Sequence, residues 1–572
     1  MGNLDAKLDT IDDFVLSTME GWKTPGAALA VVQGDDVLLM KGYGQRSVAQ
    51  NLPVTTQTVF PLASVTKAFT AMGIGLLVDE GKLDWDKPVR DYLPTFKLHD
   101  PFASQHITPR DLLCHRSGLP RHDLVWYGSN LTRKEMVEKL AHLEPSAPFR
   151  EHWQYQNLMY MTAGYLTGVV AGMTWEEFIY QRIFAPLGMK ASSISIRDMM
   201  QQPDVATGYL VKKDDVREMP LRDFPETAPA GAINSNLSDM VNWLRVHLNG
   251  GKFGDMQFVA PGTLEQMHTP QMVMPVNTLS KQITGNTIFT YGLGWMIEPY
   301  RGYTMVHHGG NIDGISTMVA FIPQAKIGVI VLTNVTARPV RDVLPYEIFD
   351  RLLDLPGNDW NARYHSLFDA LEQSEDQGKV QSETDRVKDT QPSHPLEAYV
   401  GVYENPGYPD VPITLRDGQL YVHFLGTECP IHHYHYDVFK VRYEPLDIDM
   451  NAVFATNPRG DITSVSVPLE PQVKDIVFTR KAETVDVATM TALEGVYALP
   501  IEGFTITIIR RETTLIAQIT GQGEVELIPY KGLEFNLKDA AGLSIVFTRG
   551  KDGQVNEGIL KQPGAVFPLK KQ

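Results

Sequence analysis

The sequence predicts an α+β N-terminal domain, followed by a charged linker and two small antiparallel β-barrels. Helical spacing of apolar residues, as in residues 4–20, alternates with short apolar strands, as at 27–33 and 37–44. Beyond residue 394 the pattern changes to strands separated by glycine and proline turns. Two short motifs recur there, which favours two copies of one barrel.

Length and charge limit the function classes. A chain of 572 residues is long enough for about two to four domains. Its formal net charge of -17 disfavours nucleic acid or a membrane as a partner. Cys114 and Cys429 are the only cysteines, so no disulfide framework is expected. No signal peptide or bilayer-spanning apolar run is recognisable, which predicts a cytoplasmic protein. The oligomeric state stays open, with a homo-oligomer among the alternatives.

Residues 61–70 are the first candidate for chemistry. The apolar spacing after them predicts a helix that ends near Gly81, with Ser64 in its first turn and Lys67 one turn away on the same face. A serine needs a base to become a nucleophile, and a buried lysine can lose its charge and take the proton. The helix N-terminus adds N–H groups that suit an oxyanion. A capping serine beside a surface lysine is an equally weighted alternative.

The next predicted helix begins at Thr108, the N-cap, with Pro109 at its first position. Cys114 and His115 at its end are interpreted as structural residues. Tyr155 and Asn157 then precede an apolar helix over residues 159–172. A tyrosine hydroxyl beside a lysine can relay a proton, and an asparagine amide can orient a substrate.

The third candidate segment is residues 303–314, with His307, His308 and a run of glycines. Two apolar strands follow, at 317–322 and 327–333. Glycines in a strand allow close approach of a ligand or another backbone. A histidine there can donate to, or steer, a bound acyl group. A turn or a metal site is the alternative for two adjacent histidines.

With these segments in this order, residues 10–355 resemble the serine β-lactamase and penicillin-binding-protein superfamily. The branch resembled contains class C β-lactamases, family VIII esterases and D-aminopeptidase. The motifs that carry the resemblance are Ser64-Val65-Thr66-Lys67, Tyr155-Gln156-Asn157 and His308-Gly309-Gly310. It implies a β-lactamase-like domain, in which an antiparallel sheet is flanked by helices and joined to an all-helical region.

The resemblance also implies roles for these residues. Ser64 is then the nucleophile, Lys67 its base and Tyr155 the relay to the leaving group. The backbone N–H groups of Ser64 and Asn311 would form the oxyanion hole. The residues expected to bind substrate are Asn157, His308, Gly310 and Asn311. Hydrolysis would pass through an acyl-enzyme, with no metal and no cofactor.

One departure from the family bears on the substrate. β-Lactamases and transpeptidases usually carry Lys-Thr-Gly where this chain has His308. We therefore expect a D-aminopeptidase, amidase or esterase acting on a small-molecule or short-peptide substrate. A β-lactamase or D,D-carboxypeptidase is the enzyme alternative. A non-hydrolytic receptor on the same fold, and carriage of a small ligand by the barrels, are alternatives of other classes.

The expected domains are residues 1–355, a helical and charged linker at 356–393, and barrels at 394–482 and 483–572. The barrels resemble lipocalin-like domains appended to D-aminopeptidase, where a barrel loop limits substrate choice. The same role is a hypothesis for this chain. The sequence of residues 397–403 is similar to that of residues 492–497, and the sequence of residues 475–480 is similar to that of residues 544–549. The histidines near residue 433 are expected to line a barrel rather than to hold a metal.

Overall fold

The computed structural model describes residues 7–212, 215–276, 278–371, 386–424, 426–443, 448–540 and 542–572. The chain forms two compact units. The first contains residues up to 400 together with 405–455 and 465–478, and the second contains 401–404, 456–464 and 479–572. Much of the predicted linker, residues 372–385, lies outside the described residues, and residues 360–371 before it are helical.

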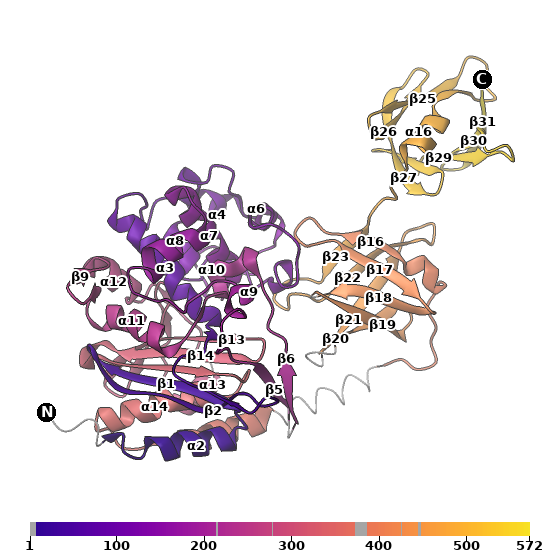
Figure 1. The fold of residues 1–572 in the computed structure, drawn as a ribbon. Helices are drawn as coiled ribbons and strands as arrows, with labels where there is room; N and C mark the ends of the chain where they lie inside the picture. Colours follow the sequence, from indigo (N-terminus) through magenta and orange to yellow (C-terminus); the bar gives the residue numbers. More distant parts are fainter. Residues whose placement is uncertain are drawn as a thin grey trace. The chain divides into compact units, whose positions relative to one another are not determined.

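A nine-stranded antiparallel sheet organises the N-terminal domain, in the order β10-β11-β12-β13-β14-β15-β1-β2-β3 (Figure 1). Its strands are β1 Gly26–Gln33, β2 Asp36–Ser47, β3 Leu52–Pro53, β10 Met272–Val273, β11 Thr290–Tyr291, β12 Met296–Tyr300, β13 Tyr303–Ile312, β14 Ile315–Ile322 and β15 Ile327–Thr333. The predicted hairpins at 27–44 and 317–333 are present as antiparallel pairs. Pairing of β15 with β1 joins the two ends of the domain.

Helices cover both faces of this sheet, as Figure 1 shows. On one face lie α2 (Ile11–Gly21) and α14 (Val340–Leu352), packed on apolar residues of the sheet. On the other, α11 (Leu237–Leu248) brings Leu244 against Gly328 of β15. Burial from both sides explains why β14 and β15 are apolar at nearly every position, without the alternation of a half-exposed strand. The helix expected from residue 4 is described as α2, from Ile11.

The helical region is built around α3 (Thr66–Asp79) and α7 (Asn157–Ala171). Both helices are buried on nearly all sides, so both are apolar all round. The predicted cap is confirmed, because the Thr108 hydroxyl accepts from the backbone N–H of Asp111 at the start of α5 (Pro109–Leu113). The other helices are α4 Pro101–His106, α6 Arg133–Lys139, α8 Trp175–Ile179, α9 Ile196–Met199, α10 Ala228–Gly231, α12 Pro261–Met267 and α13 Thr278–Thr284. Short two-stranded sheets pair β4 Phe60–Pro61 with β7 Asn234–Ser235, β5 Gly208–Lys212 with β6 Asp215–Met219, and β8 Lys252–Phe253 with β9 Met256–Gln257.

Two antiparallel barrels follow, as predicted, and each is closed and has eight strands. The first has β16 Gly401–Glu404, β17 Val411–Arg416, β18 Gln419–Phe424, β19 Thr427–His435, β20 Val438–Tyr443, β21 Ile448–Thr456, β22 Ile462–Val467 and β23 Ile476–Arg480. The second follows α16 Val487–Leu493 and has β24 Gly495–Ala498, β25 Thr505–Arg511, β26 Thr514–Ile519, β27 Gly523–Lys531, β28 Glu534–Leu537, β29 Ser544–Arg549, β30 Val555–Gln562 and β31 Ala565–Lys571. Side chains fill the second barrel, as expected at this strand number.

The sequence repeats correspond only in part. Tyr403 and Tyr497 are equivalent, since each is a fully buried tyrosine on the first strand of its barrel. The second repeat is not equivalent, because Phe478 lies on the eighth strand of one barrel and Phe547 on the sixth of the other. Strand patterns have a period of two residues and carry little information on which strand of a barrel they form.

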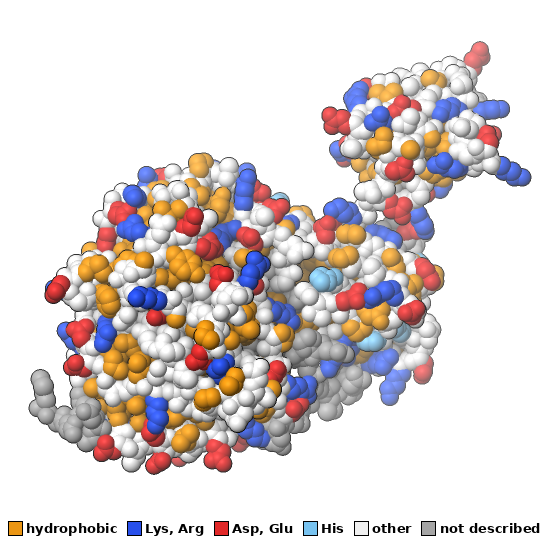
Figure 2. Space-filling view, viewed as in Figure 1, with side chains coloured by type: hydrophobic (Ala, Val, Ile, Leu, Met, Phe, Trp, Pro, Cys, Tyr) orange, Lys and Arg blue, Asp and Glu red, His pale blue; other side chains and the backbone are white. Residues whose placement is uncertain are grey.

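Acidic and basic side chains are interspersed over the face of the chain drawn in Figure 2. The excess of acidic residues is therefore spread over this face rather than gathered in one field. Within the described ranges, none of the helices combines the length and apolar character needed to cross a bilayer.

Candidate active site

Ser64 lies in a tight turn at the mouth of α3. The turn is a 3-10 helix over Ala63–Val65, so Ser64 precedes α3 rather than forming part of its first turn as expected. Ala63 has a φ of 48°, in the left-handed region that L-residues seldom occupy. Such strain is kept where the surroundings enforce it, and it is common at functional sites. Here the strained turn presents Ser64 beside Lys67, whose Nζ lies 3.2 Å from Ser64 Oγ.

Lys67 is completely buried, with 0 % of its surface exposed. Its Nζ donates to Asn157 Oδ1 at 2.7 Å and to the carbonyl oxygen of Ala230 at 2.8 Å. Burial, reinforced by the guanidinium of Arg121, lowers the pKa of Lys67 well below its usual value. A neutral amine has two N–H donors and one electron pair. The Asn157 and Ala230 oxygens can accept the two N–H groups, and the Ser64 hydroxyl lies where the electron pair can point.

The Tyr155 ring lies against Lys67, with Nζ 4.7 Å from the ring centroid. Burial raises the pKa of Tyr155, and a hydrogen bond with Ser64 offsets part of that rise. Tyr155 therefore keeps its proton near neutral pH. This favours Lys67 as the base, with Tyr155 able to pass a proton on.

Strand β13 meets the Ser64 turn at Gly310. A Cβ at this position would lie 2.1 Å from the Leu62 carbonyl oxygen and 3.0 Å from the Ala63 Cβ. Only glycine lets the strand come so close, and this explains the glycine at the third motif. The next residue, Asn311, accepts from the Ser316 hydroxyl at 2.7 Å and from other groups of its own domain. Its side chain is thus committed to the fold.

The two histidines of β13 lie on opposite faces, as strand alternation requires. His307 Nε2 lies 3.0 Å from Glu298 Oε1. His308 faces the Ser64 side and is only 1 % exposed. Its Nδ1 donates to the Gly309 carbonyl at 2.8 Å, so its Nε2 accepts from the Tyr291 hydroxyl at 2.9 Å. Burial, the largest effect, lowers the pKa of His308 to about 3, so this histidine is neutral.

A pocket of about 410 Å³ opens at Ser64. Of the predicted residues, Ser64, Asn157 and Asn311 line it, whereas Lys67, Tyr155, His308 and Gly310 do not. Three rings form an apolar wall, with Trp126 5.3 Å from Tyr127 and 5.6 Å from Phe224 between centroids. The structure thus brings Ser64, Lys67 and a cleft of substrate size together.

Arg121 and Asp123 also line this pocket, and sequence reasoning missed both. Arg121 Nε lies 2.6 Å from Asp123 Oδ2, and the guanidinium lies 5.1 Å from the centroid of the Tyr155 ring. The available signal was a run of charged and aromatic residues in the loop at 121–127, since loops placed on a rigid scaffold often carry function.

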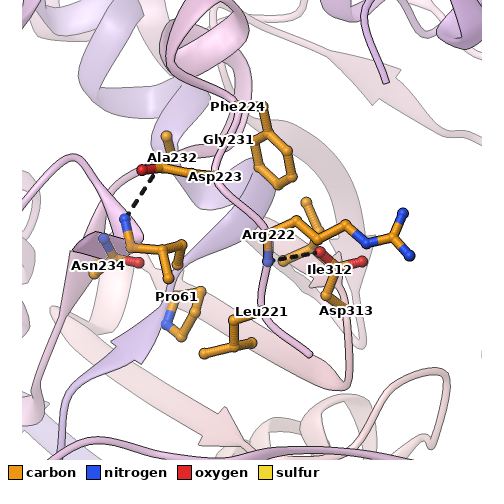
Figure 3. A pocket seen from close by; sticks show the side chains of 11 residues that line it. Pro61, Leu221, Arg222, Asp223, Phe224, Gly231, Ala232, Asn234, Ile312 and Asp313 are labelled. Atoms are coloured by element: carbon orange, nitrogen blue, oxygen red, sulfur yellow. Dashed lines mark hydrogen bonds between the residues drawn. The ribbon is translucent and has the colours of Figure 1, made fainter. Parts of the chain in front are cut away.

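A small cavity of about 10 Å³, the size of one water site, lies beside the pocket and shares Phe224 and Asp313 with it (Figure 3). Figure 3 shows the Arg222 backbone nitrogen aimed at the Asp313 carboxylate, 3.2 Å away. The Tyr127 hydroxyl donates to the same carboxylate at 2.8 Å. Burial raises the pKa of Asp313. These contacts tie the segment that carries Phe224 to the end of β13.

The first barrel borders the site. A second pocket, of about 380 Å³, shares Arg121, Asp123 and Leu124 with the Ser64 pocket, and first-barrel residues form its other side. These residues are Phe424, Tyr443, Met450, Leu469, Glu470, Pro471 and Gln472. Among the described residues no group of three or more His, Cys, Asp or Glu side chains is placed to hold a metal ion.

Residues 11–353 match the family described as Beta-lactamase, and the chain belongs to this family. Residues 385–480 match a domain of unknown function, DUF3471, over the first barrel. The unguisins hydrolase ungD' of Aspergillus campestris is 29% identical over 502 residues, which cover 82% of this chain and 91% of that protein. The protein flp of Staphylococcus aureus strain MW2 is 26% identical over 340 residues, 58% of this chain and 64% of its own. The octameric penicillin-binding protein homologue from Pyrococcus abyssi shares the fold, with a TM-score of 0.54 and 24% identity over 83% of this chain and 100% of its own.

Proposed function

We propose that this member of the β-lactamase family is a serine hydrolase that cleaves an amide or an ester through an acyl-enzyme on Ser64. The observation that carries the proposal is the environment of Lys67 Nζ. It is fully buried, its two donors are taken by Asn157 and Ala230, and its third direction faces Ser64 Oγ at 3.2 Å. A neutral amine held in this way can act as the base for a serine nucleophile.

In the proposed acylation, Ser64 Oγ attacks the substrate carbonyl carbon and its proton passes to Lys67 Nζ. The tetrahedral intermediate collapses, the bond to the leaving amine or alcohol breaks, and the leaving group takes a proton from Lys67 through the Tyr155 hydroxyl. Water then attacks the acyl-enzyme, releases the carboxylic acid and returns the proton to Ser64. The backbone N–H groups of Ser64 and Asn311 are the proposed donors to the oxyanion.

For the substrate, we favour a small peptide-like amide or an acyl ester, as a D-aminopeptidase, amidase or esterase would take. Two observations support this choice. His308, where related enzymes carry lysine, is buried and neutral, so it offers no cation to a substrate carboxylate. The wall of Trp126, Tyr127 and Phe224 suits a large apolar group beside the scissile bond. A relative with a hydrolase name, aligned over 82% of this chain, is consistent with hydrolysis.

The test is hydrolysis of a D-alanyl p-nitroanilide and of short-chain p-nitrophenyl esters by the full chain, by S64A and by S17A. Ser17 is an exposed serine of α2 and serves as the matched control. We expect S64A to lose activity by about 10³-fold or more and S17A to keep it. Turnover that survives in S64A would refute the proposal. A β-lactam that acylates Ser64 without turnover would move the assignment to the penicillin-binding type.

A further inference from the structure

A chain of hydrogen bonds runs from the proposed base to a carboxylate that no family motif includes. Lys67 Nζ donates to Asn157 Oδ1 at 2.7 Å, and Asn157 Nδ2 donates to Asp123 Oδ1 at 2.9 Å. The same Asp123 oxygen accepts from Trp126 Nε1 at 2.9 Å. The other Asp123 oxygen accepts from Arg121 Nε at 2.6 Å. Both oxygens of Asp123 are thus engaged at the edge of the pocket.

An ionised carboxylate can only accept hydrogen bonds, and this fixes the Asn157 amide. The Nδ2 group must face Asp123, so Oδ1 must face Lys67. If the amide turned over, its N–H groups would meet the N–H donors of Lys67. Lys67 would lose an acceptor, and its electron pair would no longer be held toward Ser64.

The first barrel in turn holds Asp123, through the preceding residue. His122 is 1 % exposed and has a φ of 44°. Its backbone N–H donates to Glu470 Oε2 at 2.9 Å. Its Nε2 donates to the Glu144 carbonyl at 3.1 Å, so its Nδ1 accepts from the Tyr408 hydroxyl at 2.7 Å. Glu470 and Tyr408 come from loops of the first barrel, and they fix the strained backbone from which Asp123 projects.

We propose that Asp123 is a positioning residue for the acylation of Ser64. It holds the Asn157 amide in the one orientation that keeps the electron pair of Lys67 directed at Ser64 Oγ, and the first barrel holds Asp123 through His122. This inference rests on the proposed function. In it the first barrel supports the turn that carries Asp123, and it does not need to contact the substrate.

The charges around Lys67 provide a readout that a purely structural role would not move. Arg121 lowers the pKa of Lys67 and Asp123 raises it, after the larger effect of burial. The groups that face Lys67 are Ser64, His115, Arg121, Asp123, Tyr155, Tyr160 and His308. Of these groups, Arg121 and Asp123 are the two whose charges shift the pKa of Lys67. In D123N the pKa of Lys67 should fall, and in R121M it should rise.

The experiment measures, across pH, the hydrolysis of a p-nitrophenyl ester and the rate at which a fluorophosphonate labels Ser64. We expect D123N to label about 10²-fold more slowly at its optimum, because a misplaced reacting group costs about that much. The acidic limb of the kcat/KM profile should move to lower pH in D123N and to higher pH in R121M. D13N removes an exposed carboxylate of α2 that does not line the pocket, and its limb should stay in place.

A double-mutant cycle with N157A tests the route of the effect. If Asp123 acts through Asn157, D123N should cause little further loss in the N157A background. Additive losses, an unshifted limb in D123N, or an equal shift in D13N would overturn the inference. E470A should also label more slowly than the wild type, as D123N does. A wild-type labelling rate in E470A would show that the first barrel does not support Asp123. D123S replaces D123N if thermal unfolding shows that D123N does not fold. Activity that survives in S64A would instead refute the proposed function itself.

Discussion

Replacement of Gly310 by alanine should damage the active site, whereas the same change at Gly309 should not. The two glycines are adjacent on β13 and face opposite sides of the sheet. A Cβ at Gly310 would lie 2.1 Å from the Leu62 carbonyl oxygen and 2.4 Å from Thr317 Oγ1. A Cβ at Gly309 would meet only the ends of long side chains, with Arg341 Cζ the nearest at 3.3 Å.

The expected magnitude follows from these contacts. Ordinary contact begins at 3.4 Å, so β13 and the Ser64 turn must separate by about 1.3 Å in G310A. Overpacking of this kind typically costs about 1–3 kcal/mol of stability. A displacement of about 1 Å at a reacting centre can lower the rate about 10²-fold. The Leu62 carbonyl also accepts from Thr317 Oγ1 at 2.8 Å, and the separation would break this bond.

The assay compares kcat/KM on a p-nitrophenyl ester, fluorophosphonate labelling and the thermal unfolding temperature for the wild type, G309A and G310A. G310A should lose about 10²-fold in labelling rate and unfold at a lower temperature, and G309A should stay within about threefold of the wild type. A wild-type labelling rate in G310A, or an equal loss in G309A, would refute the reasoning that β13 must touch the Ser64 turn.

Three further predictions concern buried charge. Asp111 is 0 % exposed and binds Arg116 and Arg150, so D111N should cost about 3–5 kcal/mol, toward the lower end because both arginines are partly exposed; an unchanged unfolding temperature would contradict this. The lowered pKa of His308, about 3, means that between pH 6.5 and 3 the unfolded chain binds a proton that the native chain does not. The free energy of unfolding should therefore decrease as the pH is lowered from 6.5 to 3, and it should decrease less in H308Q. An NMR spectrum that shows His308 as an imidazolium at pH 7 would contradict this. K67M should fold but fail to label, because a thioether cannot take the Ser64 proton, and labelling at the wild-type rate would exclude Lys67 as the base.

The sequence was sufficient for elements that local pattern determines. Apolar runs predicted β14 and β15. A spacing of three residues predicted that Lys67 lies beside Ser64, although Ser64 lies in the 3-10 turn before α3. It was not sufficient for the turn that holds Asp123, because Glu470, which fixes this turn, lies 348 residues away from His122 along the chain.

The position of His308 was also beyond local reasoning. Strand alternation separates it from His307, but its neutral state depends on burial, and its Nε2 meets the Tyr291 hydroxyl of another strand. The sequence pattern of a strand predicts which face of the sheet a side chain occupies, but not how deeply that side chain is buried. His308 is 1 % exposed and does not line the Ser64 pocket, and the strand pattern could not predict this depth.

Arg121 and Asp123 shift the pKa of Lys67, the proposed base, in opposite directions. A lysine whose pKa is lowered too far is neutral but accepts a proton poorly, and general-base catalysis is most efficient when the two requirements are balanced. Burial and Arg121 both favour the neutral amine of Lys67, and Asp123 favours the ammonium that forms during acylation. Asp123 contacts Arg121 directly and reaches Lys67 through Asn157. One carboxylate thus limits the effect of the neighbouring guanidinium and fixes the geometry of the base, so its removal should change both the pH profile and the rate.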